Sequence, residues 1–198
     1  MVSTTLSTPI KVAPSIFVYE NVLSQGKEFV DMVELETKNE WSPLKWGYSE
    51  TGNGQVSEYR SSQACMLRDI TYPCADSLIS KVFNNVILKE IKTCLNDYSL
   101  YHNIVTSTSE VWSLLKYEGE AQYRTHWDHD PHNSRVVSVV AFPYSTADVG
   151  GDLSFPFFDV SIKPKTGSIA IFPSNFPYTH TAHPVEQGLK YSLVTWFK

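Results

Sequence analysis

The sequence contains no cluster of basic residues and no surplus of positive charge. Lys and Arg number 16 against 21 Asp and Glu, which leaves a formal net charge of −5 at pH 7. A protein that holds nucleic acid through its phosphates needs a basic patch or stripe. We therefore expect no dedicated nucleic-acid surface.

Long apolar runs are also missing. No segment approaches the roughly 20 consecutive apolar residues that a membrane-spanning helix requires, so the sequence gives no support for membrane association. Residues 1–8 are polar and lack the charged and apolar regions of a secretory signal. These absences favour a cytoplasmic, intracellular protein.

Cysteine is scarce. Cys65, Cys74 and Cys94 show neither a CxxC motif nor another metal-binding spacing, and none lies in the histidine-rich C-terminal half, where a catalytic thiol would find a basic partner. We expect them to be reduced and to pack as small apolar residues.

The length of the chain favours one domain. With 198 residues and 42% hydrophobic content, it is long enough for one well-packed domain and short for two. We interpret residues 1–198 as a single domain, in which residues 1–109 support a core formed by residues 110–198.

The N-terminal half has a mixed pattern. Residues 16–19 form a short apolar, β-branched run typical of a strand, and Ser24 is placed to cap a helix that continues to about residue 38. Apolar residues at helical spacing predict a second helix over about 75–96, packed against a sheet.

A polar segment with few apolar residues separates the two helices. Residues 46–60 contain Gly52-Asn53-Gly54, which is typical of a loop or a hairpin tip. This segment is either a surface hairpin without a role or a substrate lid, in which flanking aromatic residues close over a peptide. Those aromatic residues are Trp46, Tyr48 and Tyr59.

The C-terminal half is strand-like to its end. Short apolar stretches are separated there by Gly, Pro, Asn and Asp, a pattern of sandwiches and jelly rolls. The expected strands are 111–117, 123–128, 135–142, 152–155, 158–162, 168–172, 179–185 and 191–197. We predict a mainly β fold with some helix: a double-stranded β-helix (jelly roll, cupin-like) whose N-terminal helices cover one sheet.

The motif His126-Trp127-Asp128 is the strongest chemical signal. On a strand, residues two apart share a face, so His126 and Asp128 aim at one point and Trp127 turns away. With His180 from a neighbouring strand, they would form the two-histidine, one-carboxylate set of non-haem Fe(II) oxygenases.

Other histidines compete for this role. His183 is a serious rival of His180, because spacing alone does not separate them. We interpret residues 129–132 as a polar loop opened by Pro131, which disrupts strand geometry where His132 would need it.

Lys190 follows His180 by ten residues. If 2-oxoglutarate chelates the iron, its distal carboxylate needs a cation, and Lys190 could hold it by a charge-assisted hydrogen bond. The alternative is a lysine exposed at a strand edge.

Six ordered segments resemble prolyl 4-hydroxylase-like 2-oxoglutarate oxygenases. They are residues 115–128, 135–138 (Arg-Val-Val-Ser), 150–156 (Gly-Gly-Asp-Leu-Ser-Phe-Pro), 164–172, 180–185 and 188–191. The resemblance covers roughly residues 110–198 and is faint before them. In its register His180 is the ligand and His183 is not, Lys190 anchors 2-oxoglutarate, and Tyr117 contacts the same co-substrate.

The resemblance implies an enzyme that uses Fe(II), 2-oxoglutarate and O2, with ascorbate as an accessory reductant. The expected reaction is hydroxylation of an unactivated C–H bond, foremost in a prolyl residue of a protein or peptide, with release of succinate and CO2. Candidate substrate contacts are Arg135, Tyr123 and Trp196.

Three alternatives stay open at this stage. The substrate could be a free amino acid or another small molecule, because a fold and a cofactor site do not fix it. A zinc hydrolase could use the same three ligands, but it would need a nearby general base and no Lys190. A non-catalytic cupin-like metal-binding module is the third alternative, but such a module would need no lysine to bind a co-substrate.

Overall fold

The structure, a computed structural model, describes residues 6, 8–40, 42, 44–48, 59–68, 77–129 and 134–198. Only the flanks of the segment interpreted as a lid are covered, since residues 49–58 lie outside the described residues. Cys74 and residues 130–133 lie outside them as well.

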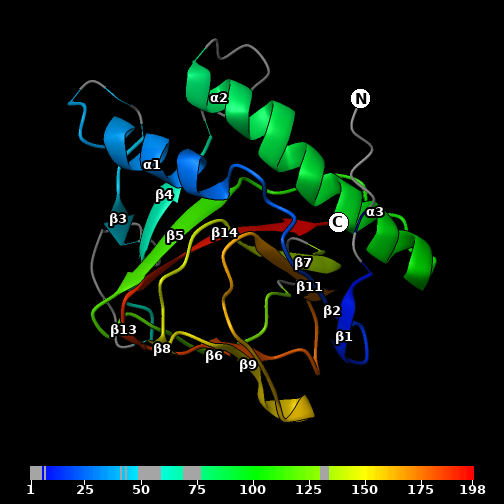
Figure 1. Cartoon of the computed structure of the whole chain (residues 1–198). Coiled ribbons are helices and arrows are strands. Elements are labelled where there is room, and N and C mark those ends of the chain that lie inside the picture. Colours follow the sequence, from blue (N-terminus) through cyan, green and yellow to red (C-terminus); the bar gives the residue numbers. More distant parts are fainter. Residues whose placement is uncertain are drawn as a thin grey trace.

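Two antiparallel sheets lie face to face beneath a layer of helices (Figure 1). Within the described ranges, the larger sheet has eight strands in the order β1-β2-β11-β7-β14-β5-β4-β3, the smaller has four in the order β10-β9-β12-β6, and β13 pairs with β8. The larger sheet comprises β1 (Ile10–Ala13), β2 (Ile16–Tyr19), β3 (Gly47–Tyr48), β4 (Gln63–Met66), β5 (Ser113–Glu118), β7 (Val137–Phe142), β11 (Ser168–Pro173) and β14 (Leu189–Phe197). The others are β6 (Tyr123–His126), β8 (Val149–Gly150), β9 (Leu153–Phe155), β10 (Val160–Ile162), β12 (His180–Ala182) and β13 (Val185–Gln187). This architecture confirms the predicted jelly roll.

Both halves of the chain build the larger sheet. The strand predicted over residues 16–19 is confirmed as β2, which pairs with β11, and β4 pairs with β5. Four of the eight strands of this sheet, as far as it is described, come from residues 1–109. The N-terminal half is therefore part of the scaffold that holds the C-terminal strands.

Strand β14 shows how the sequence pattern positions the core. Alternate side chains of a strand face opposite sides of the sheet. Tyr191, Leu193 and Phe197 belong to the large apolar cluster beneath the helices, whereas Lys190 and Ser192 line a cavity on the other side, between the sheets. One strand thus stabilises the helical layer and furnishes the site.

Helix α1 and three consecutive helical stretches cover the outer face of the larger sheet (Figure 1). In place of one helix over 75–96, the chain forms α2 (Leu78–Val82), the π-helical η1 (Phe83–Ile87) and α3 (Leu88–His102). The predicted end near residue 96 is wrong. The helix continues because Tyr98 is buried against the sheet and its hydroxyl donates to the Ser15 carbonyl at 3.0 Å.

The start of α1 also differs from the prediction. This helix spans Gly26–Glu36, and Gln25, at its N-cap position, makes no side-chain capping bond. Ser24 instead binds the Glu90 carboxylate of α3 through both its backbone N–H and its hydroxyl. Ser24 therefore joins the segment before α1 to α3 and does not cap a helix.

The strand predicted over 179–185 is two strands. His183 and Pro184 separate β12 from β13, which pair with different partners. Proline has no N–H to donate to a ladder, so the chain changes sheets at this position.

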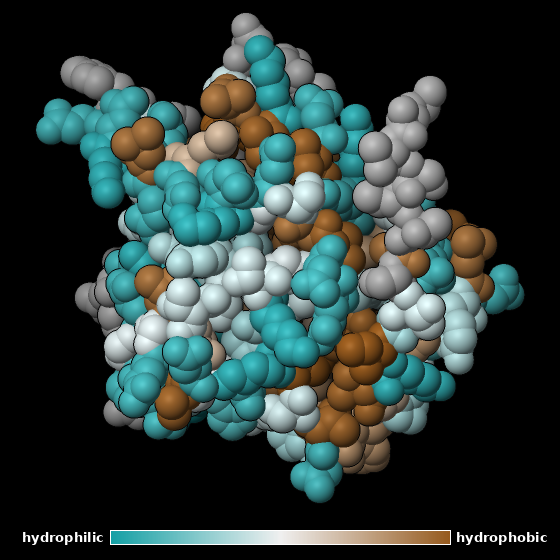
Figure 2. Space-filling model, in the orientation of Figure 1, coloured by the Kyte–Doolittle hydropathy of each residue, from teal (hydrophilic) through white to brown (hydrophobic). Residues whose placement is uncertain are grey.

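The surface over the helices is mostly hydrophilic (Figure 2), and the two described cysteines are buried. Figure 2 shows mostly hydrophilic residues over the helices on this face, with hydrophobic residues gathered lower down near β9. In the described part of the chain, no helix is long and apolar enough to cross a membrane. Cys65 and Cys94 are buried and free, as predicted, and burial raises the pKa of Cys65 to about 11 and that of Cys94 to about 12.

Candidate metal and co-substrate site

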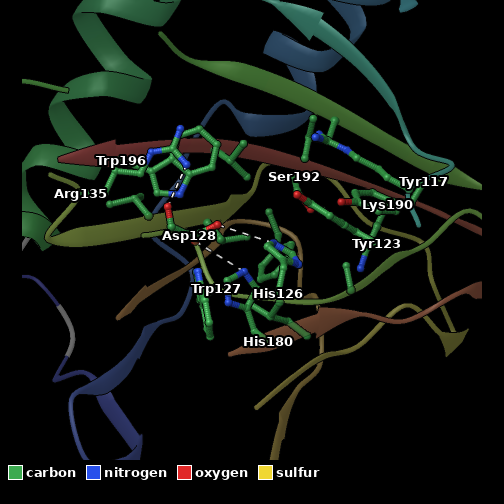
Figure 3. A pocket seen from close by; sticks show the side chains of 18 residues that line it. Tyr117, Tyr123, His126, Trp127, Asp128, Arg135, His180, Lys190, Ser192 and Trp196 are labelled. Carbon is green, nitrogen blue, oxygen red and sulfur yellow. Dashed lines mark hydrogen bonds and ion pairs between the residues drawn. The ribbon is translucent and has the colours of Figure 1, made fainter. Parts of the chain in front are cut away.

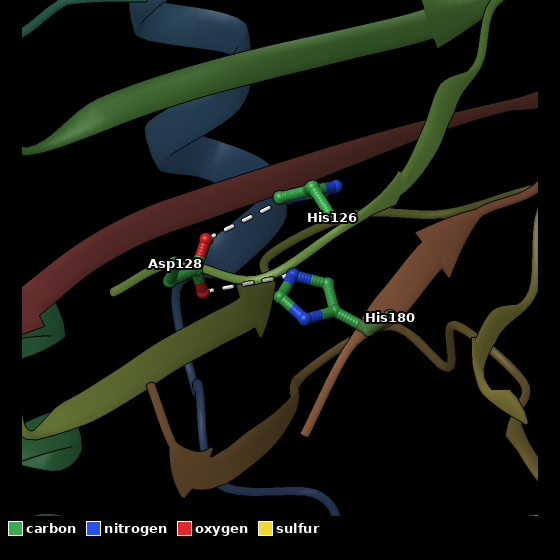
Figure 4. A group of neighbouring side chains, drawn as sticks. All are labelled: His126, Asp128 and His180. Carbon is green, nitrogen blue, oxygen red and sulfur yellow. Dashed lines mark ion pairs between the residues drawn. The ribbon is translucent and has the colours of Figure 1, made fainter. Parts of the chain in front are cut away.

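His126, Asp128 and His180 meet in a cavity of about 230 Å³ between the two sheets. One potential ligand atom from each residue lies within 4.8 Å of the other two. Figure 4 shows both imidazoles on one side of the Asp128 carboxylate, each joined to it by a dashed line. The three residues that the sequence singled out are therefore brought together.

Two adjacent strands and the irregular segment after β6 position these side chains. His126 ends β6 and pairs directly with His180 of β12, with the ring centroids 4.3 Å apart. The prediction that Asp128 belongs to the same strand is wrong, because β6 stops at His126. The N–H groups of Asp128 and His129 both donate to the Ser174 carbonyl, which draws the chain away from the ladder.

Backbone carbonyls orient both imidazoles. Nδ1 of His126 lies 2.7 Å from the Arg124 carbonyl, and Nδ1 of His180 lies 3.1 Å from the Tyr178 carbonyl. A carbonyl only accepts, so each Nδ1 carries the proton and each Nε2 keeps its lone pair. Both Nε2 atoms lie 3.6 Å from an oxygen of Asp128. The free lone pairs therefore point to the carboxylate, as a shared metal ion requires.

The protonation states suit metal binding. Burial, followed by the nearby His180, lowers the pKa of His126 to about 4, so this imidazole is neutral at physiological pH. Burial alone would raise the pKa of Asp128, but the two imidazoles and a hydrogen bond from Ser138 lower it below the ordinary value. Ser138 donates to Oδ2 of Asp128 at 2.7 Å. The imidazoles of His126 and His180 and the ionised carboxylate of Asp128 fit a ferrous ion and leave room for other ligands.

Lys190 lies deeper in the same cavity. Its side chain is 1% exposed, and Nζ donates to the Gly151 carbonyl and lies 4.6 Å from the centre of the Tyr117 ring. Burial lowers its pKa to about 7, while Asp152 opposes and Lys163 adds to this effect. The alternative of an exposed edge lysine is therefore wrong. A buried ammonium of this kind favours an anionic ligand.

The remaining predicted residues line the cavity wall (Figure 3). Tyr123 stacks on the His126 ring with centroids 3.6 Å apart. The Arg135 guanidinium lies 3.8 Å from the centre of the Trp196 ring. Trp127, predicted to turn away, is 56% exposed and lies at the cavity rim.

Two rival histidines lie outside the cluster. His183 is exposed, and its Nε2 lies 2.7 Å from the Ser154 hydroxyl. His129 is also exposed. Neither belongs to the described group that could hold a metal.

The sequence interpretation missed some residues of this site. Arg60 lines the cavity and lies 4.7 Å from the Tyr123 ring centre. Glu110 binds Arg135 with both carboxylate oxygens. Arg60 is the last residue of the segment 46–60, and only this place in a candidate lid could have drawn attention to it. Glu110 had no local signal, because its partner is 25 residues away.

Comparison with known families agrees with this geometry. Residues 112–198 match the model of the 2OG-Fe(II) oxygenase superfamily. The match begins just before β5 and includes all three clustered residues and Lys190. No curated protein matches the sequence.

Solved structures with the same fold include prolyl hydroxylases. A prolyl hydroxylase from Trichoplax adhaerens, in complex with a hypoxia inducible factor peptide fragment, is 17% identical with a TM-score of 0.68, covering 92% of this chain and 83% of that one. A viral collagen prolyl hydroxylase from Paramecium Bursaria Chlorella virus-1 is 18% identical (TM-score 0.65; 93% and 96% covered). A Pseudomonas putida prolyl-4-hydroxylase is 15% identical (TM-score 0.68; 95% of both). At these identities the likeness establishes the fold.

Proposed function

We propose that the chain is a 2-oxoglutarate- and Fe(II)-dependent oxygenase that hydroxylates a prolyl residue of a protein or peptide. The observation that carries the proposal is the joint presence of the His126, Asp128 and His180 cluster and the buried Lys190 in one cavity. The products would be the hydroxylated residue, succinate and CO2.

His126, Asp128 and His180 would hold the iron, which supplies the activation of O2 and of the substrate C–H bond. The Arg124 and Tyr178 carbonyls keep both Nε2 lone pairs available. Ser138 donates to Oδ2 of Asp128 and so helps to orient the carboxylate that would bind the metal.

Lys190 would bind the distal carboxylate of 2-oxoglutarate. Its ammonium is buried beside an aromatic ring and a carbonyl, and no ion pair with it is found in the described residues. A carboxylate would give it the charge partner that burial demands. The hydroxyl of Tyr117 and that of Ser192, which also lines the cavity, are close enough in the fold to share this role.

The outer part of the cavity would receive the prolyl substrate. The aromatic rings of Tyr123 and Trp196 line the cavity. The guanidinium of Arg135, which also lines it, lies over the Trp196 ring. Aromatic faces suit the apolar ring of proline. The peptide-bound neighbour supports a peptide substrate. We also propose that residues 1–198 act as one domain, that the protein is intracellular, and that ascorbate sustains turnover.

A turnover assay tests the proposal. The protein would be supplied with Fe(II), 2-oxoglutarate and ascorbate and incubated with proline-rich peptides, and matched peptides with alanine for proline would serve as controls. We expect succinate formation coupled to the mass gain of one oxygen on a prolyl residue. Coupled hydroxylation of another residue or of a free amino acid, with none on proline, would show that the substrate assignment is wrong.

A further inference from the structure

The main chain at Asp128 lies outside every strand. Since β6 ends at His126, no sheet ladder fixes the backbone of this candidate ligand. Its N–H donates to the Ser174 carbonyl at 3.1 Å, and its own carbonyl accepts from Nη1 of Arg135 at 2.9 Å. These two hydrogen bonds hold the peptide groups on either side of the Asp128 Cα.

Arg135 is itself held by a carboxylate. Its Nε and Nη2 donate to the two oxygens of Glu110 at 2.8 and 2.7 Å, a bidentate arrangement that fixes the plane of the guanidinium. Trp196 packs against that plane at 3.8 Å (Figure 3). Nε and Nη2 are thus directed to Glu110, while Nη1 is directed to the Asp128 carbonyl.

Glu110 is anchored on β14. Its N–H donates to the Trp196 carbonyl at 2.8 Å, and the buried hydroxyl of Thr195 donates to its carbonyl at 2.9 Å. A continuous chain of hydrogen bonds therefore runs from β14 through Glu110 and Arg135 to Asp128.

We propose that Glu110 is a positioning residue of the metal site: it holds Arg135 so that Asp128 presents its carboxylate to the two histidines. The inference rests on the proposed metal-binding role of the cluster. Because β14 also carries Lys190, the same strand sets the positions of a metal ligand and of the co-substrate anchor. The Glu110 and Arg135 pair thus couples the two halves of the site.

The direct test is the affinity of the ligand-free protein for Co(II), measured by calorimetry without 2-oxoglutarate or peptide. Glu110→Gln keeps the size of the side chain, but its amide nitrogen opposes an Arg135 donor. We expect Co(II) binding about tenfold weaker, the order typical when a group that orients a metal ligand is lost. Glu110→Asp keeps the charge and should bind Co(II) more tightly than Glu110→Gln.

A matched control removes an ion pair far from the site. Glu20→Gln breaks the pair of Glu20 and Lys165, whose atoms lie 2.7 Å apart on the surface, and should leave Co(II) affinity unchanged. Thr195→Val loosens Glu110 from β14 without touching the ion pair and should weaken Co(II) binding by a smaller factor. This variant keeps the test decisive if Glu110→Gln does not fold.

The possible outcomes are distinct. If Glu110→Gln and Thr195→Val bind Co(II) like the wild type, the inference is overturned. A rise in the peptide KM with unchanged Co(II) affinity would also overturn it, because Glu110 and Arg135 would then act in substrate binding. A lower melting temperature with unchanged Co(II) affinity would likewise reduce Glu110 to a structural residue. A wild-type protein that binds no Co(II) would overturn the proposed function as well.

Discussion

His126 and His180 are paired directly opposite each other across the β6 and β12 ladder, and their ring centroids lie 4.3 Å apart. Next to them, the hydroxyls of Thr125 and Thr181 lie 2.7 Å apart. A slip of one residue in this register would turn one imidazole to the opposite face of the sheet. The strand register is therefore what creates a pair of nitrogen ligands.

We predict that alanine at His126, Asp128 or His180 abolishes both metal binding and turnover. The described cluster has three ligand residues, and each substitution leaves only two of them to hold the metal. His183→Ala is the control, since His183 is exposed and contacts Ser154. Metal titration followed by an activity assay checks both. Loss of metal from His183→Ala, with metal retained by His180→Ala, would contradict the assignment.

Lys190→Met should weaken 2-oxoglutarate binding without loss of metal. Removal of one partner of a buried charged contact costs about 2–5 kcal/mol, which corresponds to tens-fold or more in affinity. The ligand-free variant should be at least as stable as the wild type, because an apolar side chain replaces a buried ammonium. Calorimetric titration and thermal unfolding measure the two effects. Unchanged affinity would place the anchor elsewhere.

The affinity for 2-oxoglutarate should fall as the pH rises above 7. Burial lowers the pKa of Lys190 to about 7 in the ligand-free protein, and pairing with a carboxylate raises it in the complex. Binding above pH 7 must therefore take up a proton, at a cost of about tenfold in affinity per pH unit. Titrations of Mn(II)-loaded protein from pH 6 to 9 check this. Lys190→Arg should flatten the profile, and a flat wild-type profile would argue against the shift.

Gly150→Ala should destabilise the fold by about 2 kcal/mol or more, since the backbone has φ +73° and an added Cβ would lie 2.3 Å from the Pro184 carbonyl oxygen. Gly47→Ala is the matched control, because nothing lies within 4 Å of the corresponding Cβ. Urea denaturation compares the two variants. Equal stabilities would mean that the backbone at the end of β8 relaxes without cost.

The jelly roll could be predicted from the pattern of short strands, and His126 and Asp128 from their spacing, but the choice of His180 over His183 came from the family resemblance. Metal ligation needs particular side chains, and alternation along β14 places Lys190 and Ser192 on the cavity side. The helix end near Tyr98 and the Ser24 contact with Glu90 depend on tertiary packing, which no local pattern encodes.

The surroundings of Asp128 were harder to foresee for a related reason. Its position depends on the Ser174 carbonyl, 46 residues further along the chain, and on Arg135, which is held by Glu110, 25 residues before it. Backbone acceptors leave no mark on the sequence. Strand alternation predicted the right direction for Asp128 although the strand itself ends at His126.

The most direct measurement is a crystal structure of the protein prepared without oxygen in the presence of Fe(II) and 2-oxoglutarate, with anomalous data at the iron edge. The account predicts one iron peak in bonding contact with Nε2 of His126, Nε2 of His180 and a carboxylate oxygen of Asp128, and the distal carboxylate of 2-oxoglutarate paired with Nζ of Lys190. An iron peak at other residues, or a co-substrate whose distal carboxylate points away from Lys190, would contradict it.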